Sequence, residues 1–124
     1  MSLALVLRVS AGWMGLWVIM MFFAPEMVVE GAGWEVGVEV RTILQGMGMA
    51  YIGLIVTQLV TATLVEEAMK KLAFWMAIMW AANHLQQVYF MANGTFAMDG
   101  KGIFGVVVGF AFAGLLYIKS KSDA

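Results

Sequence analysis

Four side chains that could take part in chemistry recur at helical spacing in the third apolar stretch of the chain. They are Trp80, Asn83, His84 and Gln87, called the polar stripe below. At 100° per residue they occupy an arc of about 100° on one face of an otherwise hydrophobic helix. The stretch places them near the middle of a span about 30 Å long. Polar groups at that depth must face protein, water or a ligand, because lipid cannot satisfy their hydrogen bonds.

Three kinds of chemistry fit the polar stripe. A quinone or another flat lipophile could stack on Trp80 while Asn83, His84 and Gln87 donate hydrogen bonds to its carbonyl groups. Haem or a metal could use His84, the sole histidine, but a bis-histidine haem would need a second chain. The stripe could also form hydrogen bonds between helices, each worth about 0.6 kcal/mol on average, which would fix helix register. We favour this structural role, and we expect no catalytic residue, no metal site and no bound cofactor.

The composition shows what kind of element must carry the stripe. The chain has 124 residues, of which 63% are hydrophobic and 12% charged, whereas soluble domains average about 45–50% and about 25%. Four apolar segments approach the length of about 20 residues that a membrane helix needs. They span residues 3–24, 43–64, 72–92 and 103–118. The sequence therefore predicts an all-α integral membrane protein, a single four-helix bundle over residues 1–124.

Charge distribution predicts the orientation of this bundle. Most basic residues fall near the N-terminus, in the second connection and at the C-terminus, which places both termini in the cytoplasm. These residues are Arg8, Lys70, Lys71, Lys119 and Lys121. The net charge of −1 gives no basis for nucleic-acid binding, and the absence of cysteine excludes disulfides and thiolate chemistry.

Small and polar residues in the other segments predict packing contacts. Four glycines are expected to let helices approach closely: Gly12, Gly15, Gly105 and Gly109. In the second segment, Gln58 cannot be satisfied by its own backbone and should face protein. In the acidic first connection, Arg41 is expected to form an ion pair with a nearby carboxylate such as that of Glu39.

Several short motifs resemble a family of small, four-helix, DoxX-like bacterial membrane proteins. They are Pro25-Glu26 closing the first helix, Glu39-Val40-Arg41 opening the second, the glycine-rich Gln45-Gly46-Met47-Gly48 with Gly53, and Asp99-Gly100 in the third connection. The resemblance implies a four-helix fold in a bacterial inner membrane. For some relatives it also implies association with respiratory or quinone-linked complexes. It supplies no catalytic residues.

These observations favour a non-catalytic accessory or assembly subunit of a larger membrane complex, for example a bioenergetic complex. Its partners would be other membrane subunits and lipid, or further copies of this chain. The alternative is a membrane protein that binds quinone or another lipophile through the polar stripe. A small transporter has least support, because no row of ionisable groups crosses the predicted spans.

Overall fold

The computed structural model describes residues 1–122, and these residues form helices and connecting loops without strands. The all-α prediction is therefore confirmed for the described part of the chain. The elements in order are α1 (Leu3–Phe23), α2 (Pro25–Val29), the 3-10 helix η1 (Glu30–Ala32), α3 (Val38–Thr61), α4 (Glu66–Ala92) and α5 (Gly100–Lys121).

Local capping explains where several helices begin and end. The Ser2 side chain accepts a hydrogen bond from the Leu5 amide at 3.2 Å and starts α1. Asp99 starts α5 in the same way, accepting from the Gly102 amide at 2.8 Å. Proline is accommodated at the first position of a helix but not in its interior, so Pro25 ends α1 and begins α2. Gly33, with φ of 67°, ends η1 in the left-handed conformation that favours glycine.

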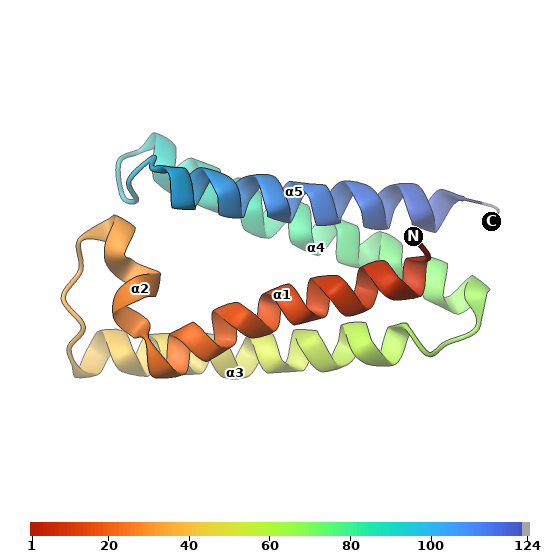
Figure 1. Ribbon diagram of the computed structural model, residues 1–124, viewed down its shortest axis with the longest axis horizontal. Helices are drawn as coiled ribbons and strands as arrows, with labels where there is room; N and C mark the ends of the chain where they lie inside the picture. The colour runs from red at the N-terminus through yellow and green to blue at the C-terminus, as the bar shows by residue number, and fades with distance from the viewer. Residues whose placement is uncertain (123–124) are drawn as a thin grey trace.

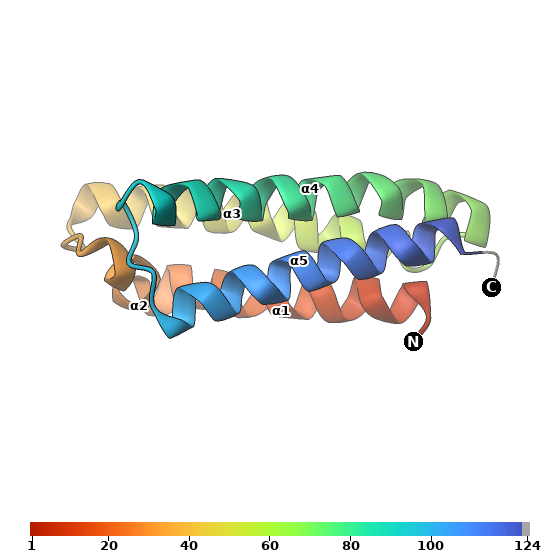
Figure 2. The same ribbon diagram turned by 90° about the horizontal axis from the view of Figure 1, so that it is seen from above.

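The four long helices lie as two antiparallel pairs (Figures 1 and 2). The α1 and α3 helices form one pair, and α4 and α5 form the other. The start of α1, the end of α5 and the α3–α4 turn lie at one end of the molecule, called the terminal end below (Figure 1). The α2 helix, η1 and the α4–α5 loop lie at the opposite end, called the loop end. The loop end therefore brings together the first and third connections.

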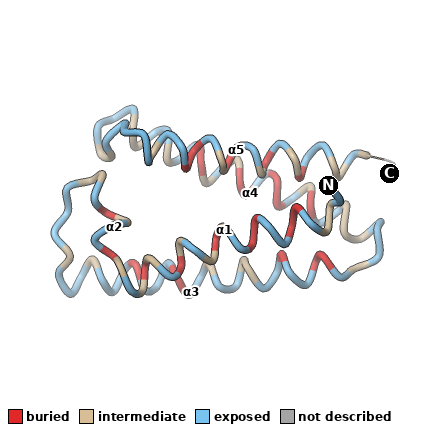
Figure 3. Tube along the Cα trace, in the orientation of Figure 1, coloured by how far each residue is buried: buried red, intermediate tan, exposed pale blue. Residues whose placement is uncertain are grey.

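Burial is concentrated on the faces that the two pairs turn toward each other (Figure 3). The larger core cluster joins the pairs and includes Val6, Leu7, Met14, Ala73, Met76, Ala77, Trp80, Ala113 and Leu116. A smaller cluster of Met21, Val29 and Leu44 holds α2 against α1 and α3. The separate second cluster means that the core between the pairs does not continue unbroken to the loop end.

One side chain links three helices inside the larger core. The Gln58 Oε1 atom of α3 accepts hydrogen bonds from the Ser10 hydroxyl of α1 at 2.6 Å and from the Trp80 indole of α4 at 3.2 Å. Gln58 is 1% exposed, so the expectation that it faces protein is confirmed. The bonds fix the register of α1, α3 and α4, because a shift of any one helix would leave a buried polar group without a partner.

Three helices are long and apolar enough to cross a membrane: α1, α3 and α5. The predicted third span coincides with α4, which has 27 residues but does not meet the same measure of composition. The difference has a physical cause. The amide and imidazole side chains of Asn83, His84, Gln86 and Gln87 fall within its apolar stretch and lower its hydropathy. Three of them, Asn83, His84 and Gln87, belong to the polar stripe.

Candidate ligand-binding site

A cavity of about 260 Å³ lies in the loop-end half of the molecule, between the two helix pairs. Engineered apolar cavities of about 150 Å³ already hold benzene, so this volume suits one substituted ring. The α1 and α3 helices contribute Trp13, Met14, Trp17, Met21, Met47 and Tyr51. The α4 and α5 helices contribute Trp80, Asn83, His84, Gln86, Gln87, Phe90, Met91, Lys101, Gly102 and Gly105. The remaining lining comes from α2, η1 and the α4–α5 loop.

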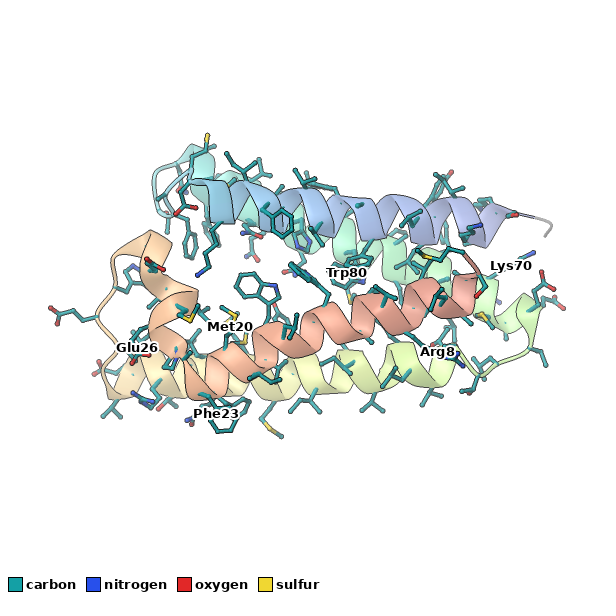
Figure 4. The ribbon with its side chains drawn as sticks, viewed as in Figure 1. Arg8, Met20, Phe23, Glu26, Lys70 and Trp80 are labelled. Atoms are coloured by element: carbon teal, nitrogen blue, oxygen red, sulfur yellow. The ribbon has the colours of Figure 1, made fainter. Side chains whose placement is uncertain are left out.

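All four residues of the polar stripe line this cavity. Trp80 lies between the helix pairs (Figure 4) and is 2% exposed, while His84 is 7% exposed. Asn83 and Gln87 are half-buried. The structure therefore divides the stripe into two parts. The Trp80 indole N–H is satisfied by Gln58. Asn83 and Gln87 also line the cavity, and their side chains make no hydrogen bond within the described residues.

His84 is held in one orientation by its surroundings. Its Nδ1 atom lies 2.8 Å from the Trp80 carbonyl oxygen, and a carbonyl oxygen only accepts hydrogen bonds. Nδ1 therefore donates and carries the ring hydrogen. The imidazole stacks on the Trp80 indole with ring centres 5.5 Å apart and an angle of 12° between planes. In the neutral ring with Nδ1 protonated, Nε2 carries a lone pair and accepts rather than donates; donation from His84 to a ligand carbonyl stays a prediction.

Two of the four predicted packing glycines make room for cavity residues. The imidazole edge of His84 occupies the place where a Cβ on Gly109 would lie. A Cβ on Gly105 would meet Trp17 at 3.8 Å and Gln87 at 3.9 Å, which are ordinary contacts. Gly12 and Gly15 differ, since no atom of the described chain lies within 4 Å of a Cβ built there. Within residues 1–122, no neighbouring helix comes that close to Gly12 or Gly15, and their role in close helix packing stays a prediction.

The loop end of the cavity carries charged residues and a set of contacts that join α2 and η1 to α5. The Lys101 ammonium donates a hydrogen bond to the Met27 carbonyl oxygen at 2.7 Å and lies 3.7 Å from a Glu30 carboxylate oxygen. The Ala97 amide donates to the Gly31 carbonyl oxygen at 2.7 Å. Glu30, Lys101 and Asp99 line the cavity there and are exposed, so the outer end of the site is polar.

The predicted ion pair of Arg41 has a different partner. Its guanidinium lies 3.9 Å from a carboxylate oxygen of Glu26, at the start of α2. No ion pair between Arg41 and Glu39 is recorded in the described residues. Helical geometry explains the change, because Glu39 and Arg41 are two residues apart on α3 and do not share a face. Both members of the observed pair are exposed, and Glu26 lies at the loop end (Figure 4).

Sequence reasoning missed the aromatic residues on the opposite wall of the cavity. Trp13 and Trp17 lie one turn apart on α1, with ring centres 6.5 Å apart, and Tyr51 extends from α3. Their spacing of four residues was a signal that both indoles share one helix face. That signal does not show which helix the face meets, and the pairing of α1 with α3 rather than α4 is a tertiary feature.

A second hollow adjoins the cavity on the outside of the α1 and α5 helices. It is lined by Trp13, Leu16, Trp17, Met20, Met27, Lys101, Phe104 and Gly105. Trp13, Trp17, Met27, Lys101 and Gly105 also line the main cavity. The site therefore combines an inner chamber bearing polar groups with a neighbouring apolar groove between α1 and α5.

Comparison with known proteins identifies no relative for this arrangement. Protein-family models, curated proteins and solved structures all yield no match to the chain. The chemistry of the site must therefore be argued from its own residues.

Proposed function

We propose that this chain is a membrane protein that binds a flat, lipophilic ring compound of the quinone class in the cavity between its two helix pairs. The observation that carries the proposal is the unpartnered state of the Asn83 and Gln87 amides beside a stacked Trp80–His84 pair in a chamber of about 260 Å³. Ligand sites are typically apolar hollows with a few polar groups that fix orientation. The aromatic walls supply the apolar surface, and the amides supply the orienting contacts.

The proposed orientation in the membrane follows from the end of the molecule at which the basic residues lie. Arg8 and Lys70 lie toward the terminal end (Figure 4), and the basic residues of the C-terminus are also there. By the positive-inside rule this end faces the cytoplasm, with all four long helices crossing a bacterial inner membrane as one bundle. The cavity then lies in the outer half of the bilayer. In this arrangement α4 packs chiefly on α5.

The groove between α1 and α5 supports a ligand that carries an aliphatic tail. Its distinctive lining, Leu16, Met20 and Phe104, is apolar, and Leu16 and Phe104 are exposed. When the ring is bound against Trp80, the tail passes beside Trp17 and lies along this groove. The same path lets the ring enter and leave. Entry from the bilayer would then need no passage through water.

A pair of glycine variants on α5 tests the proposal. Gly105→Leu fills the cavity, whereas Gly114→Leu adds the same side chain at an exposed position with open space around it. The probe is a decyl-substituted benzoquinone, and its partition is measured between protein-containing and empty nanodiscs. We expect saturable binding by the native chain and by Gly114→Leu, with loss in Gly105→Leu. Equal binding by both variants, or no saturable binding by the native chain, would refute the proposal.

A second candidate function rests on the outer face of α1. We infer that Gly12 and Gly15, which have open space around them, let a helix of another chain approach closely. This observation favours the accessory or assembly subunit, whose partner is a membrane subunit or a second copy of this chain. Purification from native membranes in mild detergent should then yield a stoichiometric complex that Gly12→Leu disrupts. Recovery of a monomer alone would argue against this role.

A further inference from the structure

The imidazole of His84 offers the cavity a hydrogen-bond acceptor that nothing in the described chain uses. Nδ1 is committed as a donor to the Trp80 carbonyl oxygen at 2.8 Å. In the neutral imidazole with the hydrogen on Nδ1, Nε2 carries the lone pair. No hydrogen bond to Nε2 occurs within the described residues.

The same atom is open to the cavity rather than sealed in the core. In the described residues, no buried side-chain nitrogen or oxygen atom is both sealed from water and without a hydrogen-bond partner. Nε2 has no partner, so a water-sized probe must reach it. His84 as a whole is 93% covered, being 7% exposed, and it lines the chamber. Because His84 is a lining residue of the chamber, we infer that Nε2 is reached from that side.

The ring cannot readily change this role. Three contacts restrict rotation of the imidazole. It stacks on Trp80, it lies 6.2 Å from Phe110 between ring centres, and it packs against Gly109. The neighbouring Asn83 and Gln87 amides each contain donors and an acceptor and can turn to suit either kind of ligand atom. His84 is thus the group in the cavity that distinguishes ligands that donate hydrogen bonds from ligands that only accept them.

We propose that the cavity selects ring compounds that carry a hydroxyl group, such as phenols and quinols, over ethers and carbonyl compounds of the same shape. The hydroxyl donates to His84 Nε2, whereas a carbonyl or ether oxygen placed there would face a second lone pair and leave the buried acceptor unsatisfied. A net hydrogen bond of about 0.5–1.5 kcal/mol corresponds to a preference of roughly 2- to 12-fold. This selectivity rests on the proposed function, since it requires a ring in the cavity.

A matched pair of probes isolates the hydroxyl. Binding of 4-nonylphenol and of its methyl ether, 4-nonylanisole, is measured by partition between protein-containing and empty nanodiscs. We expect the phenol to bind several-fold more tightly to the native chain and to Leu85→Phe, a control on the exposed face of α4. In His84→Phe, which keeps an aromatic ring, the two affinities should become equal. Equal affinities in the native chain, or a preference that survives in His84→Phe, would overturn the inference while leaving the proposed function standing. Failure of both probes and of the quinone to bind would remove the proposed function as well.

A second measurement needs no variant, because the chain has one histidine. Selective ¹⁵N labelling of histidine gives one Nδ1 and one Nε2 signal. We expect Nδ1 to be protonated and Nε2 to be bare in the free protein, with the Nε2 signal moving toward the hydrogen-bonded position as the phenol is added. A protonated Nε2 in the free protein, or an Nε2 signal unmoved by saturating phenol, would contradict the inference.

Discussion

Alanine at Gly109 tests how the cavity positions its histidine. An ideal Cβ at Gly109 would overlap the His84 ring atoms Nε2, Cδ2 and Cε1. The imidazole would have to move by roughly 1.5 Å to restore ordinary van der Waals separation. The ring is stacked on Trp80 and hydrogen-bonded to the Trp80 carbonyl oxygen. The movement therefore breaks existing contacts, whereas an unrestrained side chain would simply rotate away. Overpacking of this kind typically costs about 1–3 kcal/mol.

Gly105→Ala supplies the matched control one helical turn earlier on α5. Its added Cβ would meet only ordinary contacts, at 3.8 Å from Trp17 and 3.9 Å from Gln87. Both substitutions gain the same helix propensity, about 1 kcal/mol, so this term cancels in their difference. We therefore expect Gly109→Ala to be less stable than Gly105→Ala by about 1–3 kcal/mol.

The stability difference is measured by reversible unfolding in mixed micelles, together with the ¹⁵N spectrum of the single histidine. Gly109→Ala should move the histidine signals, and Gly105→Ala should leave them near their native positions. Two variants of equal stability with unchanged histidine signals would show that His84 does not lie against Gly109. The assignment of Nε2 to the cavity would then fail with it.

Three further outcomes follow from other contacts. Gln58→Leu leaves the buried Trp80 indole N–H without its acceptor, while the Ser10 hydroxyl keeps the Leu7 carbonyl oxygen at 3.0 Å. It should lower the unfolding free energy by about 1–3 kcal/mol, measured in the same micelles; an effect below about 0.5 kcal/mol would refute the three-helix link. Lys101→Met removes the donor to the Met27 carbonyl oxygen and should speed amide hydrogen exchange in α2 but not in the α3–α4 turn, and equal exchange in both forms would contradict the contact. For the proposed orientation, a cysteine at Ser120 should react with a membrane-impermeant thiol reagent only in inverted vesicles, and one at Thr95 only in spheroplasts; the reverse pattern would invert the topology.

The sequence was sufficient to predict the four long helices and the burial of Gln58, because both depend on local patterns. The segments 72–92 and 103–118 lie within α4 and α5, whereas 3–24 and 43–64 overlap α1 and α3 and run a few residues past their ends. Gln58 is buried as expected. Threonine in the second segment also behaves as local geometry dictates, since Thr61 donates to the Thr57 carbonyl oxygen one turn back at 2.7 Å. The third segment proved less apolar than a membrane span by composition, which reflects the polar stripe itself.

The cavity could not be predicted, because it depends on which helices pair. The stripe on α4 is visible in the sequence, but the indoles that face it come from α1, about 65 residues earlier. The role of His84 also needed structure, since only the position of the Trp80 carbonyl oxygen identifies which ring nitrogen donates. The partner of Arg41 lies on α2 for a similar reason: the short helix after Pro25 folds back to α3. The resemblance to the DoxX-like family stays a prediction.

Photo-crosslinking with a ring probe tests the central claim most directly. The probe is a benzoquinone with a diazirine on its ring substituent, activated in nanodiscs at saturating and at trace concentration and mapped by peptide mass spectrometry. The account predicts that labelling at Trp17 and Gln87 is competed by unlabelled decylbenzoquinone and is lost in Gly105→Leu but not in Gly114→Leu. Labelling spread over exposed positions such as Ile43 and Val56, with no competition and no effect of Gly105→Leu, would contradict it.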